Sequence, residues 1–324
     1  MSIKIKDIQR PIINEMKEFE RKFRSSMKTD VMLLDQIMRY IIHRKGKQIR
    51  PMFVFLSAGI NGGITESTYR AASLIELVHT ASLVHDDVVD DSDYRRGFFS
   101  IKVLWKNKIA VLVGDFLLSK GLDLSVKNQE YKLLGIINQS VTEMSEGELL
   151  QIEKARKLNI SEEVYYEIIR KKTASLIASC CAAGASSAGV EDDLIEKSRL
   201  LGEKIGLAFQ IKDDLFDYGD EEIGKPTGID IKEKKMTLPL IYALNNSGRL
   251  QRNRIINIVK RHSNKPAKVQ EVINFVKQSG GITYTKEVMI GYVNEAYTIL
   301  KEFPDSPFKE SLKQLIQYTI ERTK

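Results

Sequence analysis

The feature that most constrains this chain is the placement of its prolines. The chain has seven, and none lies between Pro51 and Pro226. A proline inside a helix costs about 3 kcal/mol, so this gap permits several long helices in series. Apolar residues in segment 69–90 recur at steps of three, four and seven residues, at Leu74, Val78, Ala81 and Val88. This spacing predicts a helix with one apolar side.

The rest of the chain also favours an all-α fold. Segment 130–157 carries Leu133, Ile136, Ile137 and Val141 on one helical side, and the period-two alternation typical of strands is scarce. Loops are predicted at residues 61–63, 97, 219–228, 245–248, 263–266, 280–281 and 304–307, where Gly, Asn, Ser or Pro gather. No fixed-period repeat and no long linker divides the sequence. We therefore predict one all-helical domain over residues 1–324.

Composition places the chain among soluble globular proteins, with 43% hydrophobic and 29% charged residues. The net charge of +7 suits anionic substrates or a membrane surface, but it is also common in Lys-rich helical proteins. Binding to nucleic acid would rest on this net charge alone and is not expected.

The two cysteines, Cys180 and Cys181, are adjacent and fit neither a disulfide framework nor a metal site. They lie in the uncharged run 174–190, which is rich in small residues and too short to span a membrane. We expect a tightly packed buried helix there. Residues 1–16 lack the apolar block of a signal peptide, so a reducing, cytoplasmic location is expected.

Two acidic clusters share the same spacing. The first is Asp86-Asp87-Val88-Val89-Asp90, and on a helix Asp86 and Asp90 lie only about 40° apart around the axis. The second, Asp213-Asp214-Leu215-Phe216-Asp217, also follows an apolar helical stretch. Carboxylates arranged in this way suit Mg²⁺, which keeps several waters and bridges to substrate phosphates. One such cluster could be a solvated helix end, but two suggest the walls of a single metal site.

Cationic residues accompany the clusters. Arg95 and Arg96 follow the first cluster, Lys47 and Arg50 form a pair three residues apart, and His79 lies two turns before Asp86. Arginine grips phosphate oxygens with a planar fork, and lysine acts as a point charge. Beside two acidic clusters, these residues indicate that a phosphorylated substrate binds together with the metal.

These motifs resemble those of the trans-isoprenyl diphosphate synthases, the polyprenyl synthetase family. The resemblance covers about residues 46–240 and rests on Gly46-Lys47, Arg50-Pro51, Leu83 to Asp90 with Arg95-Arg96-Gly97, Lys172-Thr173, Phe209 to Asp217, Gly224-Lys225-Pro226, Lys235 and Thr237 to Leu240. The lead-in His79-Thr80-Ala81-Ser82 is most similar to the long-chain members, such as octaprenyl and solanesyl diphosphate synthases.

The resemblance implies a bundle of long helices around a deep central cavity, usually in a homodimer. Three Mg²⁺ ions would bind an allylic diphosphate between the acidic walls, with Asp86, Asp90 and Asp213 as ligands and Asp87, Asp214 and Asp217 as ligands or supports. Arg95, Lys172, Thr173, Gln210, Lys225 and Lys235 would hold the allylic diphosphate, and Lys47, Arg50, His79 and Arg96 would hold isopentenyl diphosphate. The catalytic residues would be Asp86, Asp90, Asp213, Lys172 and Arg95.

The product expected from the resemblance is a long all-trans polyprenyl diphosphate of the kind used for quinone side chains. Ala81 and Ser82 lie five and four positions before Asp86, and their small side chains would leave the cavity open for a long chain. Transient association with a membrane through this product is a further expectation.

Other functions stay open at this stage. A short-chain farnesyl or geranylgeranyl diphosphate synthase would use the same motifs. A terpene cyclase generally replaces the second acidic motif and lacks the paired cations. A metal phosphohydrolase using His79, His85 and Asp86 would leave the second cluster unexplained and needs further histidine ligands, although the chain has only four histidines. A non-catalytic partner subunit would have no need for intact acidic motifs.

Overall fold

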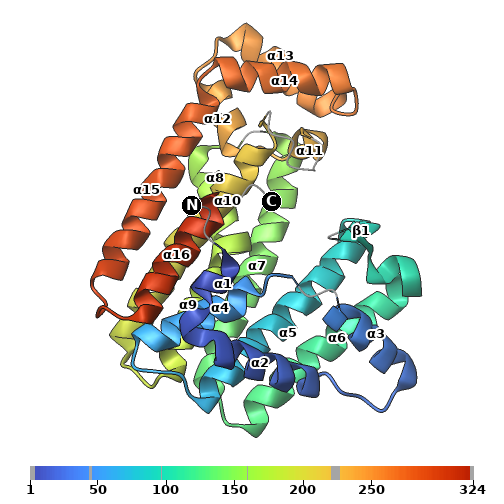
Figure 1. Ribbon diagram of the computed structural model, residues 1–324. Coiled ribbons are helices and arrows are strands. Elements are labelled where there is room, and N and C mark those ends of the chain that lie inside the picture. Colours follow the sequence, from blue (N-terminus) through green and yellow to red (C-terminus); the bar gives the residue numbers. More distant parts are fainter. Residues whose placement is uncertain (1–3, 44–45, 96, 159, 220–226, 322–324) are drawn as a thin grey trace. The chain divides into compact units, whose positions relative to one another are not determined.

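The computed structural model describes residues 4–43, 46–95, 97–158, 160–219 and 227–321. The described chain is helical apart from one short hairpin, which confirms the all-α prediction (Figure 1). Its first half contains α1 (Ile5–Ile8), η1 (Arg10–Ile12), α2 (Ile13–Ser26), α3 (Met32–His43), α4 (Ile49–Ile60), α5 (Glu66–Val89), β1 (Tyr94–Arg95), β2 (Phe98–Phe99), α6 (Ile101–Lys127) and α7 (Tyr131–Lys157). Its second half contains α8 (Glu162–Ile169), the π-helical segment η2 (Arg170–Ala174), α9 (Ser175–Ser187), α10 (Asp192–Phe216), α11 (Ile229–Lys232), α12 (Leu238–Asn245), α13 (Arg249–Arg261), α14 (Pro266–Gln278), α15 (Gly281–Lys301) and α16 (Pro307–Glu321).

Two compact units make up the chain. Unit 1 comprises residues 1–141, 179–199 and 303–314, and unit 2 comprises residues 142–178, 200–302 and 315–324. Helices α7, α9, α10 and α16 each contribute residues to both. A single domain over the whole chain stays a prediction.

In unit 1, α5 packs along α6 because α6 offers glycines at the contact. A β-carbon at Gly121 would lie 2.8 Å from Leu74, and one at Gly114 would lie 2.0 Å from the His85 ring. Both distances are shorter than van der Waals contact, so larger residues would force the helices apart. The capping box of Thr65 and Thr68 fixes the start of α5.

The small-residue run forms α9, as predicted, and is buried. In unit 1 a β-carbon at Gly184 would lie 2.4 Å from the Val54 carbonyl oxygen of α4. The Ser57 hydroxyl donates a hydrogen bond of 2.6 Å to the Cys181 carbonyl oxygen. Cys180 and Cys181 are buried and free.

In unit 2, the same close packing joins α10 to the first residues of the buried run. A β-carbon at Gly206 would meet Ala174 at 2.5 Å, and one at Gly202 would meet the Ile177 carbonyl oxygen at 2.6 Å. Helix α12 begins with a proline in its first turn and packs against α15, where Gly281 closely approaches the Pro239 carbonyl oxygen. These glycines fix the position of α10, which carries the second acidic motif.

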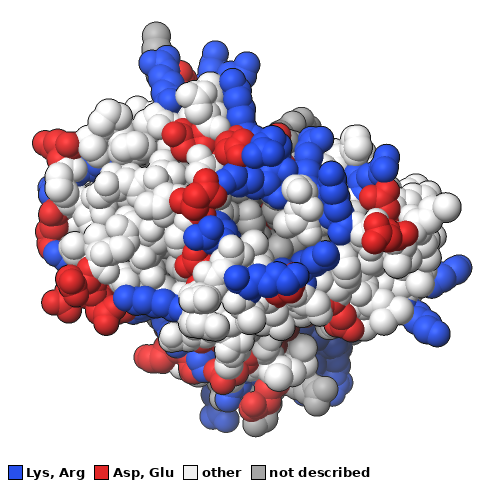
Figure 2. Space-filling model, turned by 90° about the horizontal axis from the view of Figure 1, so that it is seen from below, with Lys and Arg blue, Asp and Glu red and all other residues white. Residues whose placement is uncertain are grey.

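The surface carries both signs of charge, and Figure 2 shows acidic and basic side chains intermixed on one face. None of the described helices is both long and apolar enough to cross a membrane.

Candidate active site

The first acidic motif forms the last turn of α5. The helix ends at Val89, and Asp90 is its C-cap, with its backbone N–H bonded to the Asp86 carbonyl oxygen at 2.8 Å. Asp86 is half-buried and Asp90 is exposed. Because the two residues are one turn apart, their carboxylates emerge from the same side of α5, as the sequence predicts.

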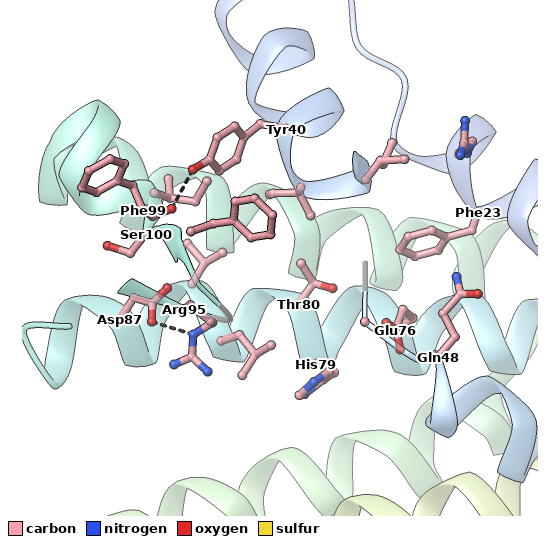
Figure 3. A pocket seen from close by; sticks show the side chains of 18 of the residues that line it. Phe23, Tyr40, Gln48, Glu76, His79, Thr80, Asp87, Arg95, Phe99 and Ser100 are labelled. Atoms are coloured by element: carbon pink, nitrogen blue, oxygen red, sulfur yellow. Dashed lines mark hydrogen bonds and ion pairs between the residues drawn. The ribbon is translucent and has the colours of Figure 1, made fainter. Parts of the chain in front are cut away.

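Asp87 points to a different side of α5 and is buried. Its carboxylate accepts a hydrogen bond of 2.6 Å from Arg95 Nε in β1, an ion pair drawn in Figure 3. Burial raises the pKa of Asp87, and the Arg95 guanidinium opposes that shift. Asp87 therefore supports the position of Arg95, which the sequence analysis assigns to the diphosphate.

A buried lysine that was not predicted from the sequence forms ion pairs with the loop after the motif. Lys102, buried in the first turn of α6, forms ion pairs with Asp91 and with Asp93, the latter at 3.4 Å. Both aspartates are exposed. Lys102 draws the ends of the loop together around the hairpin that carries Arg95.

His85 adjoins the motif but faces α6. Its Nε2 atom lies 3.2 Å from the Val111 carbonyl oxygen and 3.6 Å from an Asp115 carboxylate oxygen. The imidazole therefore does not join the carboxylates of Asp86 and Asp90. The donor set at the end of α5 consists of oxygen atoms, as a hard cation such as Mg²⁺ requires.

A pocket of about 120 Å³ lies along α5 in unit 1. It is mainly apolar, with Phe23, Tyr40 and Phe99 opposite His79 and Thr80 (Figure 3). The Tyr40 hydroxyl donates a hydrogen bond of 2.6 Å to the Phe99 carbonyl oxygen and joins α3 to the hairpin. Three predicted site residues, His79, Asp87 and Arg95, line this pocket together.

The predicted cations Lys47 and Arg50 lie at the start of α4. Lys47 is exposed and Arg50 is half-buried. Between them Gln48 has the left-handed conformation, with φ 53° and ψ 39°. This conformation costs a side-chain-bearing residue on the order of 1 kcal/mol, and such strain tends to persist at functional sites.

In unit 2 the second motif forms the last turn of α10, which ends at Phe216. Asp213 is half-buried, whereas Asp214 and Asp217 are buried. The three carboxylates therefore have different surroundings despite their common motif.

Both Asp214 carboxylate oxygens accept hydrogen bonds. The buried Tyr165 hydroxyl donates to Oδ2 at 2.7 Å, and Gln210 Nε2 donates to Oδ1 at 2.8 Å. The Thr173 hydroxyl in turn donates to Gln210 Oε1 at 2.8 Å. Burial, followed by the nearby Asp230 charge, raises the pKa of Asp214 to about 7. This network joins the predicted residues Thr173, Gln210 and Asp214.

Asp217 fixes the entry to α11. Its carboxylate accepts hydrogen bonds from the backbone N–H groups of Ile229 at 2.7 Å and Asp230 at 3.2 Å. The positive N-terminus of α11 favours this carboxylate, although burial raises its pKa. Asp230 has its pKa raised to about 6 by burial and by the Asp217 charge. Lys235 lies 2.5 Å from Glu233 and 4.0 Å from Asp230.

Lys172 and Thr173 lie in the π-helical segment η2 between α8 and α9. Such segments widen the helix locally and are frequent at functional sites. The Lys172 ammonium forms an ion pair with Glu148 of α7 and lies 3.4 Å from Gln151 Oε1. Gly147 lets α7 approach this segment, because a β-carbon there would lie 2.7 Å from the Lys172 backbone nitrogen.

The predicted site residues in the described part of the chain thus divide between the two units. Two further predicted site residues, Arg96 and Lys225, lie outside the described residues. Among the residues that are described, no three His, Cys, Asp or Glu side chains gather closely enough to hold a metal ion. Four further residues of these contacts were not predicted from the sequence: Lys102, Glu148, Tyr165 and Asp230. Only Asp230 carries a signal in sequence, as a third carboxylate close to the second motif.

Comparison with known proteins identifies the family. Residues 31–276 match the sequence model of the family described as Polyprenyl synthetase. A short chain isoprenyl diphosphate synthase of Methanothermobacter thermautotrophicus is 36% identical over 289 residues, 87% of this chain and 88% of that protein. The octaprenyl diphosphate synthase of Escherichia coli is 33% identical over 298 residues, 91% of this chain and 92% of that protein.

Solved structures agree with the sequence matches. The polyprenyl synthase of Caulobacter crescentus, solved with calcium and isoprenyl diphosphate, superposes with a TM-score of 0.91 at 33% identity. The match covers 100% of this chain and 99% of that one. The fold is thus that of the isoprenoid synthases, with the helices and motifs described above. The chain is a trans-prenyl transferase and belongs to the polyprenyl synthetase family.

Proposed function

We propose that this enzyme condenses isopentenyl diphosphate with an allylic diphosphate, head to tail, into a long all-trans polyprenyl diphosphate. One observation carries the proposal: both acidic motifs occupy the last turn of a long helix. The C-terminus of a helix is its negative end, so carboxylates there are disfavoured. Two acidic clusters in these positions are expected where cations bind.

The donors fit Mg²⁺, since Asp86 and Asp90 present only oxygen atoms and the neighbouring His85 faces α6. We propose that Asp86, Asp90 and Asp213 hold three ions, with Asp87, Asp214 and Asp217 as supports or additional ligands. When bound, the metal supplies Lewis-acid stabilisation of the diphosphate leaving group. The calcium and isoprenyl diphosphate in the Caulobacter crescentus enzyme support a divalent ion and a diphosphate in one site.

The protein side chains bind and orient the two substrates. We assign Arg95, Lys172, Thr173, Gln210, Lys225 and Lys235 to the allylic diphosphate, and Lys47, Arg50, His79 and Arg96 to isopentenyl diphosphate. Lys172 must exchange its ion pair with Glu148 for phosphate oxygens when substrate binds. Ionisation of the allylic C–O bond gives a carbocation, and the Thr173 hydroxyl and Gln210 amide offer it oxygen dipoles. The isopentenyl double bond then attacks, and a proton leaves to the departing diphosphate.

A test of this assignment uses purified protein, labelled isopentenyl diphosphate, Mg²⁺ and allylic primers of increasing length, with products resolved by chromatography. Asp86→Ala and Asp213→Ala should keep native circular dichroism and lower turnover by at least about 10²-fold. Asp193→Ala, an exposed carboxylate in the first turn of α10, is the matched control. Near-normal turnover in either motif variant would refute the metal assignment.

The length of the product depends on the residues below the first motif. The small side chain of Ser82 supports a long chain, and so does the similarity to relatives such as the octaprenyl diphosphate synthase of Escherichia coli. The short chain synthase at 36% identity favours a shorter product as a second candidate. By helical spacing Ser82 shares the side of Asp86, whereas the fully buried Ala81 lies with Leu74 and Val78 on the side that packs against α6.

Both positions can be tested by adding bulk. Ser82→Phe should shorten the product by filling the Asp86 side of the helix one turn deeper, about 5.4 Å away. Ala81→Phe adds bulk on the side that packs against α6, so it should lower stability with little effect on product length. Product length is read by chromatography against wild type, with thermal unfolding as a check on packing. A product of unchanged length from Ser82→Phe would contradict the proposal that a small residue at this position leaves the cavity open.

A further inference from the structure

The segment from Gly248 to Gln270 has an unusual charge. It contains seven Lys or Arg residues and no Asp or Glu, and it comprises α13, the turn that follows it, and the start of α14. The net charge of the whole chain is +7, so this short segment carries as much excess charge as the complete sequence. The rest of the chain is therefore balanced.

Basic residues on other surface helices have acidic partners one turn away. Examples are Arg21 with Glu18, Arg39 with Asp35, Lys127 with Asp123 and Arg199 with Glu196. On the α13–α14 hairpin only Glu271 supplies a carboxylate, and it pairs with Arg254 at 2.6 Å and Lys268 at 2.8 Å. Arg249, Lys260, Arg261 and Lys265 are exposed and form no ion pair among the described residues.

Helical geometry gathers these charges on the outer side of α13. Ile255, Ile258 and Val259 are the buried residues of the helix, and they face α12 and α14, which lies beside α13 in Figure 1. At 100° per residue, Arg249, Lys260 and Arg261 project from the opposite side. Leu250 projects between them and is 89% exposed. The outer face therefore combines unpaired cations with one apolar side chain.

We propose that the outer side of α13, with Arg249, Leu250, Lys260 and Arg261, docks on the anionic headgroups of a lipid bilayer, together with the exposed Lys265 of the turn that follows. Clusters of basic residues are attracted to anionic lipid within a Debye length of the surface. Leu250 gains by leaving water for the acyl boundary, whereas a nucleic-acid backbone offers it no apolar environment. A membrane also suits the proposed product, which is an oily chain with a charged end, although docking does not depend on that product.

The test is co-flotation of the full-length protein, without substrate, on phosphatidylcholine vesicles with and without about 30% phosphatidylglycerol. Binding is expected only to the anionic vesicles and should fall between 0.1 and about 0.5 M salt. Replacing Arg249, Lys260, Arg261 and Lys265 together by Gln should weaken partitioning by about 100-fold or more. Leu250→Ser should weaken it by about tenfold and leave the salt dependence unchanged.

The matched control replaces four exposed lysines elsewhere, Lys17, Lys28, Lys286 and Lys313, by Gln and changes the net charge equally. It should keep nearly wild-type binding. An equal loss of vesicle binding in the control variant would mean that net charge alone determines binding, and this would overturn the proposal. Tighter binding to a short DNA duplex than to anionic vesicles at the same salt concentration would also overturn it. Both four-residue variants should retain prenyl transfer in detergent-free solution, so failure of docking is distinguishable from failure of the proposed activity.

Discussion

At the scale of single residues, the carboxylate of Asp214 depends on Tyr165, whose hydroxyl donates to it at 2.7 Å. Tyr165→Phe removes this donor and keeps the buried ring. An unsatisfied buried acceptor costs about 1–3 kcal/mol, and the Gln210 and Thr173 side chains bonded in series should then lose their fixed position. We expect kcat to fall about 10-fold to 100-fold, with little change in KM for isopentenyl diphosphate.

The neighbouring Tyr166→Phe is the matched control for this experiment, because the Tyr166 ring packs against Tyr292, whereas the hydroxyl that donates to Asp214 is that of Tyr165. Steady-state kinetics with each substrate varied in turn separates the two parameters. If both variants raise both KM values equally and leave kcat unchanged, Tyr165 stabilises the fold and does not position Gln210.

A second prediction concerns the pH dependence of stability. Burial raises the pKa of Asp214 to about 7, well above the ordinary value of 3.8. Between pH 3.8 and about 7 the Asp214 carboxyl is protonated in the folded protein and ionised in the unfolded chain. Its contribution to the free energy of unfolding is therefore present at low pH and is lost as the pH rises to about 7. Asp214→Asn removes the titration.

In metal-free protein the unfolding temperature of Asp214→Asn should therefore rise relative to wild type as pH increases from about 5 to about 8, by an amount equivalent to a few kcal/mol. Thermal unfolding followed by circular dichroism at several pH values measures the difference. The exposed carboxyl variant Asp193→Asn should run parallel to wild type. A constant difference between Asp214→Asn and wild type would contradict the raised pKa.

These residues mark the limit of sequence reasoning. The spacing within Asp86 to Asp90 and Asp213 to Asp217 predicted motifs at helix ends, because spacing along a helix is local geometry. Tyr165 lies 49 positions from Asp214, and no periodicity connects them. Their hydrogen bond depends on how α8 and α10 pack, which the pattern of one helix does not encode.

At the scale of elements, apolar periodicity located long helices well. The predicted segments 69–90 and 130–157 correspond to α5 at Glu66–Val89 and α7 at Tyr131–Lys157. The pairing of β1 with β2 and the π-helical segment η2 were not predicted. A π-helical turn changes the helical register over only a few residues, which is too short a stretch for apolar periodicity to resolve.

The contact between α7 and η2 gives a prediction at this scale. A β-carbon at Gly147 would lie 2.7 Å from the Lys172 backbone nitrogen and 2.9 Å from the Lys171 side chain. Gly147→Ala must push η2 away from α7 and displace Lys172 and Thr173. We expect a loss of about 1–3 kcal/mol in the free energy of unfolding and a clear fall in kcat/KM for the allylic substrate.

Gly135→Ala on the same helix should not lower stability, because no other atom lies within 4 Å of the position that its β-carbon would take. Alanine is the better helix former, so this variant should gain up to about 1 kcal/mol. Denaturant unfolding compares the two variants. Equal stability changes for both would mean that the close approach of η2 to Gly147 carries no strain.

At the scale of the whole molecule, two exposed surfaces differ in chemistry and should bind different partners. The outer side of α13 is cationic, whereas α6 exposes a mainly apolar stripe that includes Val111, Leu112, Leu122 and Val126. Solvated helices rarely present such a stripe, and a contiguous apolar patch is typical of a protein interface. The family resemblance implies a homodimer, and we propose that a second copy of the chain occupies this face.

The last prediction therefore concerns the homodimer. Leu112→Glu combined with Leu122→Glu places two charges on the α6 stripe, and burying them without partners would cost several kcal/mol. Light scattering during gel filtration should show a dimer for wild type and a monomer for this variant, with helical content unchanged because both side chains are about half exposed. Met32→Glu, at an exposed position on α3, is the control and should remain dimeric. A dimer that survives both charges on α6 would assign the subunit contact to another face.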